Sequence, residues 1–278
     1  MWISQSKSAQ AGLLKQLHVR IRTMEAAQNQ MTVNLARVRE RMDNAASRAA
    51  RPPEEITLVA VSKTHPAVRI QELYEAGVRH FGENRVQEWE SKHPALVNLA
   101  ATWQMIGHVQ SNKASRVVRL FDSVDTVDSA ALAERLDRAK EEFDTENAKN
   151  TAVKEKGKRD EGPAPRLRVL IEVKLDPGPT KSGVSAQELP RLVENVLALP
   201  RLELRGLMGV PPYFDDVEQA RPYFVRLREL RDSVRAHLGR ELLPILSMGM
   251  SHDFEVAIEE GATEIRVGTA LFGERPKA

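Results

Sequence analysis

The sequence lacks cysteine, carries almost no net charge and contains no long apolar run. None of its 278 residues is cysteine, which excludes disulfides, thiolate metal ligands and cysteine nucleophiles. Its 41 basic and 39 acidic side chains leave a formal net charge of only +2, so neither a nucleic acid nor a membrane surface is an expected partner. No apolar run approaches the roughly 20 residues that a membrane-spanning helix needs.

Residues 1–30 contain a single acidic side chain, Glu25, and no apolar core of signal-peptide length. We interpret them as a disordered N-terminal extension, or as residues that precede a true start at Met31. A docking helix or targeting segment is the alternative. A chain with no signal peptide and no cysteine is expected in the cytoplasm.

A repeated pattern of strand and helix occupies the rest of the chain. Eight segments, separated by helical stretches, are predicted to be strands: residues 56–62, 78–84, 103–107, 122–128, 166–175, 202–210, 243–249 and 263–268. Residues 56–62 and 166–175 have the apolar composition of buried strands, whereas 122–128 has the weakest strand pattern. Strands that alternate with helices lie parallel and are joined by right-handed crossovers. Eight such units predict one closed (β/α)8 TIM barrel over residues 31–278. An open doubly wound sheet is the alternative, but no GxGxxG motif follows the first strand.

Two segments lie outside the eight repeats. Residues 31–50 predict an extra amphipathic helix before the first strand, with Val33, Leu35, Val38 and Met42 near one face. The other segment, around residues 140–165, is dense in charges of both signs and ends in glycines and prolines. This composition predicts a helix that continues into a solvated loop insertion.

The ligand site of a (β/α)8 barrel lies at the carboxyl ends of its strands. Lys63 directly follows the first apolar strand, so we expect its amine to be partly desolvated at the mouth of the barrel. Desolvation lowers the pKa of a lysine and makes its amine a nucleophile that can form a Schiff base with an aldehyde. The alternative is an ordinary lysine at a strand end, with its ammonium group in water.

The loops after the seventh and eighth strands have the composition of an anion site. Residues 247–251 (SMGMS) form a glycine-containing turn before a helix, and Gly268 and Thr269 follow the last strand. Backbone N–H groups, the Ser251 hydroxyl and a helix dipole attract phosphate, and this fold commonly binds phosphate in these two loops. The alternative for Ser251 is a helix cap. A lysine and a phosphate site at one mouth fit pyridoxal 5′-phosphate, which has an aldehyde and a phosphate.

Arg266 lies on the last strand, and its side chain points in the same direction as those of residues 264 and 268. If that direction is inward, its guanidinium group can donate to the pyridine nitrogen of the cofactor. A charged arginine there would keep the nitrogen unprotonated and weaken the ring as an electron sink. The alternative is a salt bridge inside the barrel, with Glu264 or Glu172.

Seven segments carry a family resemblance, in order along the chain: AVSKT (60–64), HFGENRVQE (80–88), WQMIGHVQSNK (103–113), KSGV (181–184), GLMGV (206–210), LSMGMSHDFEVAI (246–258) and IRVGTALFGER (265–275). Over residues 31–275 the sequence resembles the pyridoxal phosphate homeostasis proteins. That family is similar to the barrel domain of alanine racemase, the type III fold of pyridoxal phosphate proteins. The resemblance implies the same fold and the same cofactor for this chain.

The resemblance also implies roles for individual residues. It implies that Lys63 carries the cofactor as an aldimine and that Arg266 faces the pyridine nitrogen. The other residues implied to bind the cofactor are Ser251, Gly268 and Thr269 at the phosphate, and Asn84 and Ser247 in the pocket wall. Three departures stand nearby: His65 where some members have lysine, Arg85 where some have tyrosine, and Gln104 where histidine is more usual. His65 and Arg85 put a second lysine site or lysine-to-lysine transfer in doubt.

The expected function is to carry pyridoxal phosphate and deliver it to apo-enzymes that use it, as a monomer. Two-base racemases of this fold use a tyrosine from an additional β-domain. No such domain is expected here, because the sequence ends at Ala278 soon after the eighth strand, and Tyr213 is the one tyrosine expected near the mouth. The alternatives are a low-activity amino-acid racemase and a Schiff-base aldolase acting on a phosphorylated sugar.

Several weaker candidates surround the predicted mouth. His108 and His252 have no further ligands at metal-binding spacing, so no metal is expected. Lys113 and Lys181 are candidate secondary contacts to the aldehyde or the phosphate, or solvated loop lysines.

Overall fold

The computed structural model describes residues 30–154, 164–176, 178 and 182–274. Apart from Gln30, the predicted extension over residues 1–30 therefore lies outside the described residues. The same holds for residues 155–163 of the predicted charged insertion. Within the described part of the chain, no helix is both long enough and apolar enough to cross a membrane.

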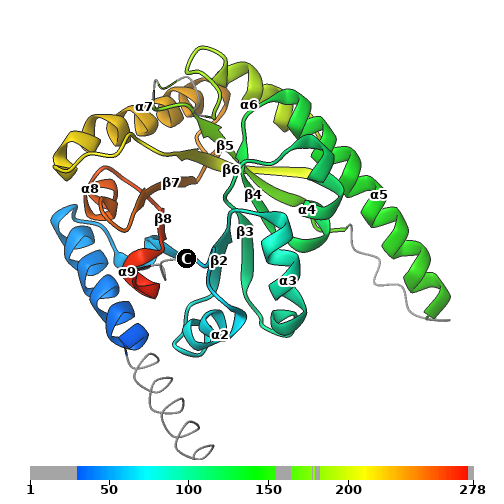
Figure 1. Cartoon of the computed structure of the whole chain (residues 1–278). Helices are drawn as coiled ribbons and strands as arrows, with labels where there is room; N and C mark the ends of the chain where they lie inside the picture. The colour runs from blue at the N-terminus through cyan, green and yellow to red at the C-terminus, as the bar shows by residue number, and fades with distance from the viewer. Residues whose placement is uncertain (1–29, 155–163, 177, 179–181, 275–278) are drawn as a thin grey trace, which may run out of the picture.

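Eight parallel strands close into a barrel in which each strand pairs with the next and β8 pairs with β1 (Figure 1). The strands are β1 (Thr57–Val61), β2 (His80–Glu83), β3 (Thr102–Met105), β4 (Ser123–Val127), β5 (Leu167–Val173), β6 (Leu202–Gly209), β7 (Ile245–Met250) and β8 (Glu264–Val267). Each strand begins and ends within two residues of its predicted segment. The predicted (β/α)8 barrel is confirmed.

Helices surround the strands (Figure 1). They are α2 (Ala67–Glu75), α3 (Val86–Leu96), α4 (Ala114–Leu120), α5 (Ala130–Lys154), α6 (Leu189–Leu197), α7 (Arg221–Leu238), α8 (Phe254–Glu259) and α9 (Thr269–Phe272), with short 3-10 turns η1 (Pro53–Glu55), η2 (Ser111–Lys113) and η3 (Val217–Ala220). In α6, Leu189, Leu192, Val193 and Val196 are buried. This i, i+3, i+4, i+7 spacing forms the apolar stripe by which a helix packs on the barrel.

Two boundaries near the mouth differ from the predictions. The loop predicted after the eighth strand contains the short helix α9, in which Leu271 and Phe272 are buried. The helix predicted from Ser251 is α8, which begins only at Phe254 with Asp253 in the N-cap position. Helix α5 extends to Lys154, which agrees with the predicted helical start of the charged insertion.

The predicted extra helix is present and spans residues 30–48 in the described part of the chain. Met31, Leu35, Val38, Met42 and Ala45 form its buried face. The prediction for Val33 was wrong: it is 40% exposed, because two residues advance a helix by about 200° and so place Val33 away from Met31. The helix lies beside α8 and α9 (Figure 1), where its Asn34 donates to the Leu271 carbonyl at 3.0 Å. It therefore belongs to the shell that supports the loop after β8.

Candidate functional site

The residues predicted to bind the cofactor lie at the carboxyl ends of β7, β8, β1 and β2. These four strands are consecutive neighbours in the barrel, so their ends form one continuous part of the mouth, which we call the site arc. Arg266 of β8 pairs with Met250 of β7 on one side and with Val59 of β1 on the other. Val61 of β1 pairs with Gly82 of β2. The arc holds all of the predicted site residues: Lys63, Asn84, Ser247, Ser251, Arg266, Gly268 and Thr269.

Lys63 lies in a tight turn just beyond the end of β1. The N–H of His65 donates to the Ser62 carbonyl at 3.1 Å and closes the turn, with Lys63 in its second position. Thr64, in the third position, has a φ of 67°, the left-handed region that glycine or asparagine normally occupies at this position of a type II turn. Lys63 is partly buried, so it is partly desolvated as the sequence predicts.

A buried polar cluster lies beneath this turn, between β1, β2 and α3. It consists of Ser62, Glu83, Glu88 and Lys92, and we call it the Lys92 cluster. Lys92 Nζ donates to the Ser62 carbonyl at 2.9 Å. It also forms ion pairs with Glu83 at 2.9 Å and with Glu88 at 2.6 Å. The Ser62 hydroxyl donates to Glu83 at 2.7 Å, and the Thr64 N–H donates to Glu88.

The two carboxyl groups of the Lys92 cluster respond differently to burial. Burial raises the pKa of Glu83, although the Lys92 ammonium and the Ser62 hydroxyl act in the opposite direction. Burial also acts to raise the pKa of Glu88, but hydrogen bonds from Lys92 and the Thr64 N–H outweigh it, so that pKa is lowered. Sequence reasoning missed this cluster. The i, i+4 spacing of Glu88 and Lys92 on a helix was the available signal, and it does not show that Lys92 is buried.

Arg266 lies almost completely buried at the base of the site arc, 5% exposed. Its two Nη groups donate to the Ser247 hydroxyl at 2.6 Å and to the Gly209 carbonyl at 3.0 Å. Among the described residues no ion pair joins Arg266 to Glu264 or Glu172, the alternative that the sequence left open. Burial lowers the pKa of Arg266, and the negative field of Glu264 and other carboxylates opposes this.

A second polar cluster fills the barrel interior next to Arg266. Gln104, Ser123, Asp125 and Glu264 compose it, and we call it the interior acid layer. The Gln104 amide donates to Glu264 at 2.9 Å and to Asp125 at 3.4 Å. Because β3 and β8 are not neighbours in the sheet, the bond between Gln104 and Glu264 crosses the interior of the barrel. Side chains of this layer take the place of the branched apolar residues that usually fill a barrel.

The pKa of Asp125 is raised well above its ordinary value. Burial is the main cause, and the negative charge of Glu264 adds to it, while the Ser123 hydroxyl at 2.8 Å lowers it. A carboxyl group in this environment keeps its proton to higher pH. Sequence reasoning missed this layer, because Asp125 and Gln104 look like ordinary polar positions until the barrel shows which side chains point inward.

The loops after β7 and β8 meet at the hydroxyl of Ser251. Its oxygen accepts from the backbone N–H groups of Gly268 at 3.1 Å and Ala270 at 3.3 Å. The helix-cap alternative for Ser251 was wrong, since α8 begins at Phe254 and the hydroxyl binds the other loop instead. A hydroxyl that accepts two N–H groups can still donate its own proton to a ligand oxygen.

Asn84 occupies a crowded position beside Lys63. Its side-chain oxygen is buried and has no hydrogen-bond partner among the described residues. The loop after β3 packs directly on its backbone, because a Cβ on Gly107 would lie 2.2 Å from the Asn84 carbonyl oxygen. Only glycine permits this approach, and an unpaired buried oxygen at a barrel mouth is a free acceptor for a ligand.

Other candidates lie apart from the arc or are engaged elsewhere. Tyr213, in the loop after β6, is 75% exposed and stacks on His252 with ring centroids 5.2 Å apart. Lys113 ends the turn η2, and Lys181 lies outside the described residues. Nδ1 of His108 lies 3.6 Å from a carboxylate oxygen of Asp128. The described residues contain no group of three or more His, Asp or Glu side chains that could hold a metal ion.

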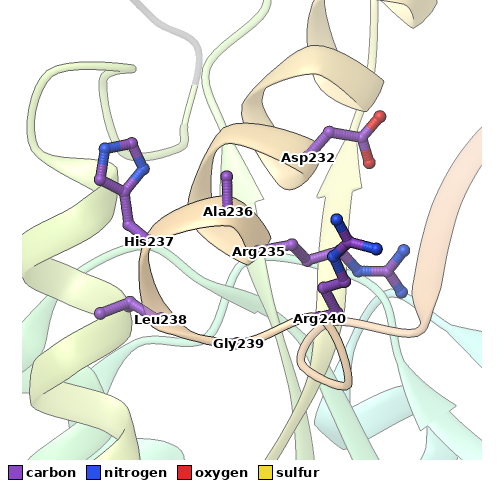
Figure 2. Close-up of a pocket in the computed structure, with 7 residues that line it drawn as sticks. All are labelled: Asp232, Arg235, Ala236, His237, Leu238, Gly239 and Arg240. Carbon is purple, nitrogen blue, oxygen red and sulfur yellow. The ribbon is translucent and has the colours of Figure 1, made fainter.

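Two hollows in the surface differ in their position relative to the site arc. One, of about 170 Å³, adjoins the site arc and is lined by Val210, Tyr213, Phe214, Met250 and His252 among others. The other, of about 770 Å³, surrounds the carboxyl end of α7 (Figure 2). Arg235 in this second hollow donates to the Leu242 and Leu243 carbonyls, at 2.7 and 3.1 Å. Its lining comes from one helix end and the residues that follow it, and it contains none of the predicted site residues.

Comparisons with known proteins agree with this geometry. The family model of the alanine racemase N-terminal domain matches residues 33–276. The chain is 43% identical over 241 residues to the pyridoxal phosphate homeostasis protein of Aquifex aeolicus, and the aligned region covers 87% of this chain and 96% of that protein. It is 40% identical over 256 residues to the protein of that name from Escherichia coli K12, covering 89% and 97%.

Solved structures add a comparison of fold. PipY of Synechococcus elongatus, in a structure with PLP bound, is 37% identical with a TM-score of 0.68, covering 84% of this chain and all of that one. Alanine racemase of Corynebacterium glutamicum is 16% identical with a TM-score of 0.60, covering 89% of this chain and 61% of that one, which shows the fold alone. With its barrel, its site arc and these relatives, this chain belongs to the alanine racemase N-terminal domain family and, within it, to the pyridoxal phosphate homeostasis proteins.

Proposed function

We propose that this protein binds pyridoxal 5′-phosphate in the site arc, links it covalently to Lys63, and takes part in the cell's homeostasis of that cofactor. The observation that carries the proposal is the convergence of an amine, a buried guanidinium group and two hydroxyl-containing loops on one part of the mouth. The relatives named pyridoxal phosphate homeostasis proteins support the same cofactor.

The residues present fit the cofactor. Binding would give the unpaired buried oxygen of Asn84 a partner. The site also has space at Gly268, where an added Cβ would come no closer than 3.5 Å to Val61. The N–H groups of Gly268 and Ala270 bind the oxygen of Ser251, which leaves the hydroxyl proton of Ser251 for a ligand oxygen such as that of a phosphate.

Each residue of the arc has a role that follows from its chemistry. Lys63 would hold the cofactor through its amine, and the cofactor would supply the aldehyde that condenses with this amine with loss of water. Ser251 donates its hydroxyl proton to the phosphate. Arg266, held by Ser247 and the Gly209 carbonyl, presents a positive charge to the ring nitrogen and keeps it unprotonated. While it is linked to Lys63, the cofactor would carry no free aldehyde.

A carrier fits the comparisons better than a racemase. The relatives that are 40–43% identical are named for homeostasis, whereas the racemase structure is 16% identical and shares the fold alone. We propose that the protein works in the cytoplasm, as a monomer, and releases the cofactor to apo-enzymes that need it. Exposure at the mouth suits such a transfer, because Thr269 is exposed and Lys63 is only partly buried.

The first test is the visible absorption spectrum of the purified protein with pyridoxal phosphate, beside Lys63→Ala and the control Lys113→Ala. We expect an absorption band of the linked cofactor in the wild type and in Lys113→Ala, and its loss in Lys63→Ala. Borohydride reduction followed by peptide mass spectrometry should locate the cofactor on Lys63. A band that survives in Lys63→Ala contradicts the assignment of the lysine, and no band in any protein contradicts covalent binding.

A second experiment separates a carrier from a racemase. The loaded protein is incubated with single amino acids in heavy water, and exchange of the α-hydrogen is followed by NMR. A carrier should leave the α-hydrogen in place over many turnover times of a racemase. Rapid exchange that Lys63→Ala abolishes would instead establish the racemase alternative.

A further inference from the structure

The turn that presents Lys63 is fixed at nearly every polar group that surrounds it. All three polar groups of Ser62 are bonded: its N–H to the Gly82 carbonyl at 3.0 Å, its hydroxyl to Glu83 at 2.7 Å, and its carbonyl to both His65 N–H and Lys92 Nζ. On the other side of Lys63, the N–H of Thr64 is bonded to Glu88. The peptide groups before and after Lys63 are therefore each held by a charged side chain of α3.

These two holding groups act as one unit. Glu88 and Lys92 are one helical turn apart on α3 and form an ion pair of 2.6 Å. Lys92 is 8% exposed and Glu83, its second partner, is fully buried. A buried ammonium group with two carboxylate partners and a carbonyl partner cannot move without leaving a charge unpaired in the protein interior, which is strongly unfavourable. The cluster is therefore a rigid support for the turn.

The backbone of the turn contains a strained residue, Thr64. Thr64 holds a φ of 67°, a conformation that β-branched residues rarely adopt. Such strained residues persist only where the surrounding structure holds them, and they gather at functional sites. The bond from the Thr64 N–H to Glu88 and the bond from Lys92 to the Ser62 carbonyl hold the two peptide groups that flank Lys63, directly before the strained residue.

We propose that Lys92 and Glu88 are positioning residues for Lys63: they hold its turn in the strained form that aims the amine into the site arc. This inference rests on the proposed function, because it assigns to the Lys92 cluster the task of placing the amine that links the cofactor. Neither residue touches the cofactor in this role. They act through the backbone on either side of Lys63.

The test compares two glutamates of the same helix. Glu88 and Glu90 both lie on α3, with side chains 24% and 28% exposed, and both form short ion pairs, Glu88 with Lys92 at 2.6 Å and Glu90 with Arg116 at 2.7 Å. Only Glu88 contacts the Lys63 turn. Glu88→Ala is the test variant, Glu90→Ala is its matched control, and Glu88→Gln is the conservative variant, since an amide oxygen can still accept from Thr64.

The first measurement uses the full-length protein without cofactor. Hydrogen exchange followed by NMR should show the Thr64 amide exchanging at least tenfold faster in Glu88→Ala than in the wild type. Glu90→Ala should stay within twofold of the wild type, and Glu88→Gln should lie between. Circular dichroism checks that each variant is folded. An unchanged Thr64 amide in Glu88→Ala overturns the inference.

The second measurement follows the covalent band after addition of pyridoxal phosphate. Glu88→Ala should form the band at least tenfold more slowly, or need at least tenfold more cofactor, with restoration by Glu88→Gln and no effect of Glu90→Ala. If Glu88→Ala forms the band as the wild type does, the positioning role is overturned while the proposed function stands. If the wild type forms no band, the proposed function fails and the inference falls with it.

Discussion

Two buried polar clusters adjoin the site arc, and they balance charge in opposite ways. In the Lys92 cluster an ammonium group contacts both carboxyl groups directly, at 2.9 and 2.6 Å. In the interior acid layer, the bonds to Asp125 and Glu264 come from the neutral Gln104 amide and Ser123 hydroxyl. The first cluster therefore keeps a carboxylate charged, as the lowered pKa of Glu88 shows. In the second, burial raises the pKa of Asp125 well above its ordinary value, so this carboxyl group keeps its proton to higher pH.

The difference shows how one barrel mouth can both fix the position of the Lys63 turn and limit the negative charge near Arg266. A buried ion pair with further hydrogen bonds is rigid, since breaking it leaves an unpaired buried charge. It suits the turn of Lys63, which must be held in place. A carboxyl group that keeps its proton to higher pH, as the raised pKa of Asp125 implies, adds less negative charge near Arg266 than a carboxylate would. It suits a site in which the guanidinium group has to stay available to a ligand.

The largest expected effect comes from removing the cation of the Lys92 cluster. Lys92→Met should lower the free energy of unfolding by about 3–5 kcal/mol at neutral pH, because Glu83 is left as an unpaired buried charge. Urea unfolding measures the loss. The control Arg116→Met, which removes the half-exposed partner of Glu90, should cost at most about 1 kcal/mol. Equal losses in the two variants would contradict the contrast between a buried and an exposed pair.

The next effect comes from removing the neutral bridge of the interior acid layer. Gln104→Leu leaves carboxyl oxygens of Asp125 and Glu264 without their donor, so it should cost about 1–3 kcal/mol of unfolding free energy at neutral pH. Gln104→His, which keeps a ring N–H donor, should cost less. Chemical denaturation of both variants makes the comparison. A leucine variant as stable as the wild type would show that the amide does not support the layer.

Asp125 should also give the stability of the fold a pH dependence, whose sign follows from its raised pKa. Asp125 has a raised folded pKa, so as pH rises above the ordinary unfolded value of about 3.9, the unfolded chain releases a proton that the folded protein keeps. Wild-type stability falls there by up to about 1.4 kcal/mol per pH unit from this group, until the pH reaches the folded pKa. Asp125→Asn lacks this loss, so its free energy of unfolding should increase relative to that of the wild type as pH rises from about 4.

Urea unfolding between pH 3 and pH 8 tests this sign. The stability of Asp125→Asn relative to the wild type should increase with pH. That of Lys92→Met should decrease with pH, because Glu83 ionises and is left without its cation. A difference between Asp125→Asn and the wild type that stays constant over this range would mean that Asp125 does not hold a proton in the fold.

The smallest effect concerns the strain that the Lys92 cluster holds. Thr64→Gly should stabilise the fold by about 0.5–1 kcal/mol, because relief of the left-handed strain of about 1–2 kcal/mol exceeds the entropy cost of glycine. Ala50→Gly is the comparison, since Ala50 has a φ of 51° but lies outside the Lys63 turn. Thermal unfolding measures both. Destabilisation by Thr64→Gly would show that the turn carries no strain for the cluster to resist.

Much of the fold and the membership of the site arc could be predicted from sequence. Segments such as residues 56–62 are short, apolar and β-branched, so their strand character is local. Once eight strands alternate with helices, closure into a barrel brings the carboxyl ends of all strands to one mouth. Lys63 and Gly268 could therefore be assigned to the same mouth although about 200 residues separate them. Val33 shows the limit of such reasoning, because periodicity alone did not decide which helical face is buried.

The sequence by itself determined the barrel, the position of Lys63 at the end of β1 and the two loops that follow β7 and β8. These features follow from local patterns and from strand order. Only the tertiary structure decided that Ser251 binds the loop after β8, that Lys92 supports the Lys63 turn and that Gln104 joins two acids across the barrel. The physical reason is that burial and hydrogen-bond partners depend on side chains brought together from distant strands and helices. No local pattern in the sequence records which of them will meet.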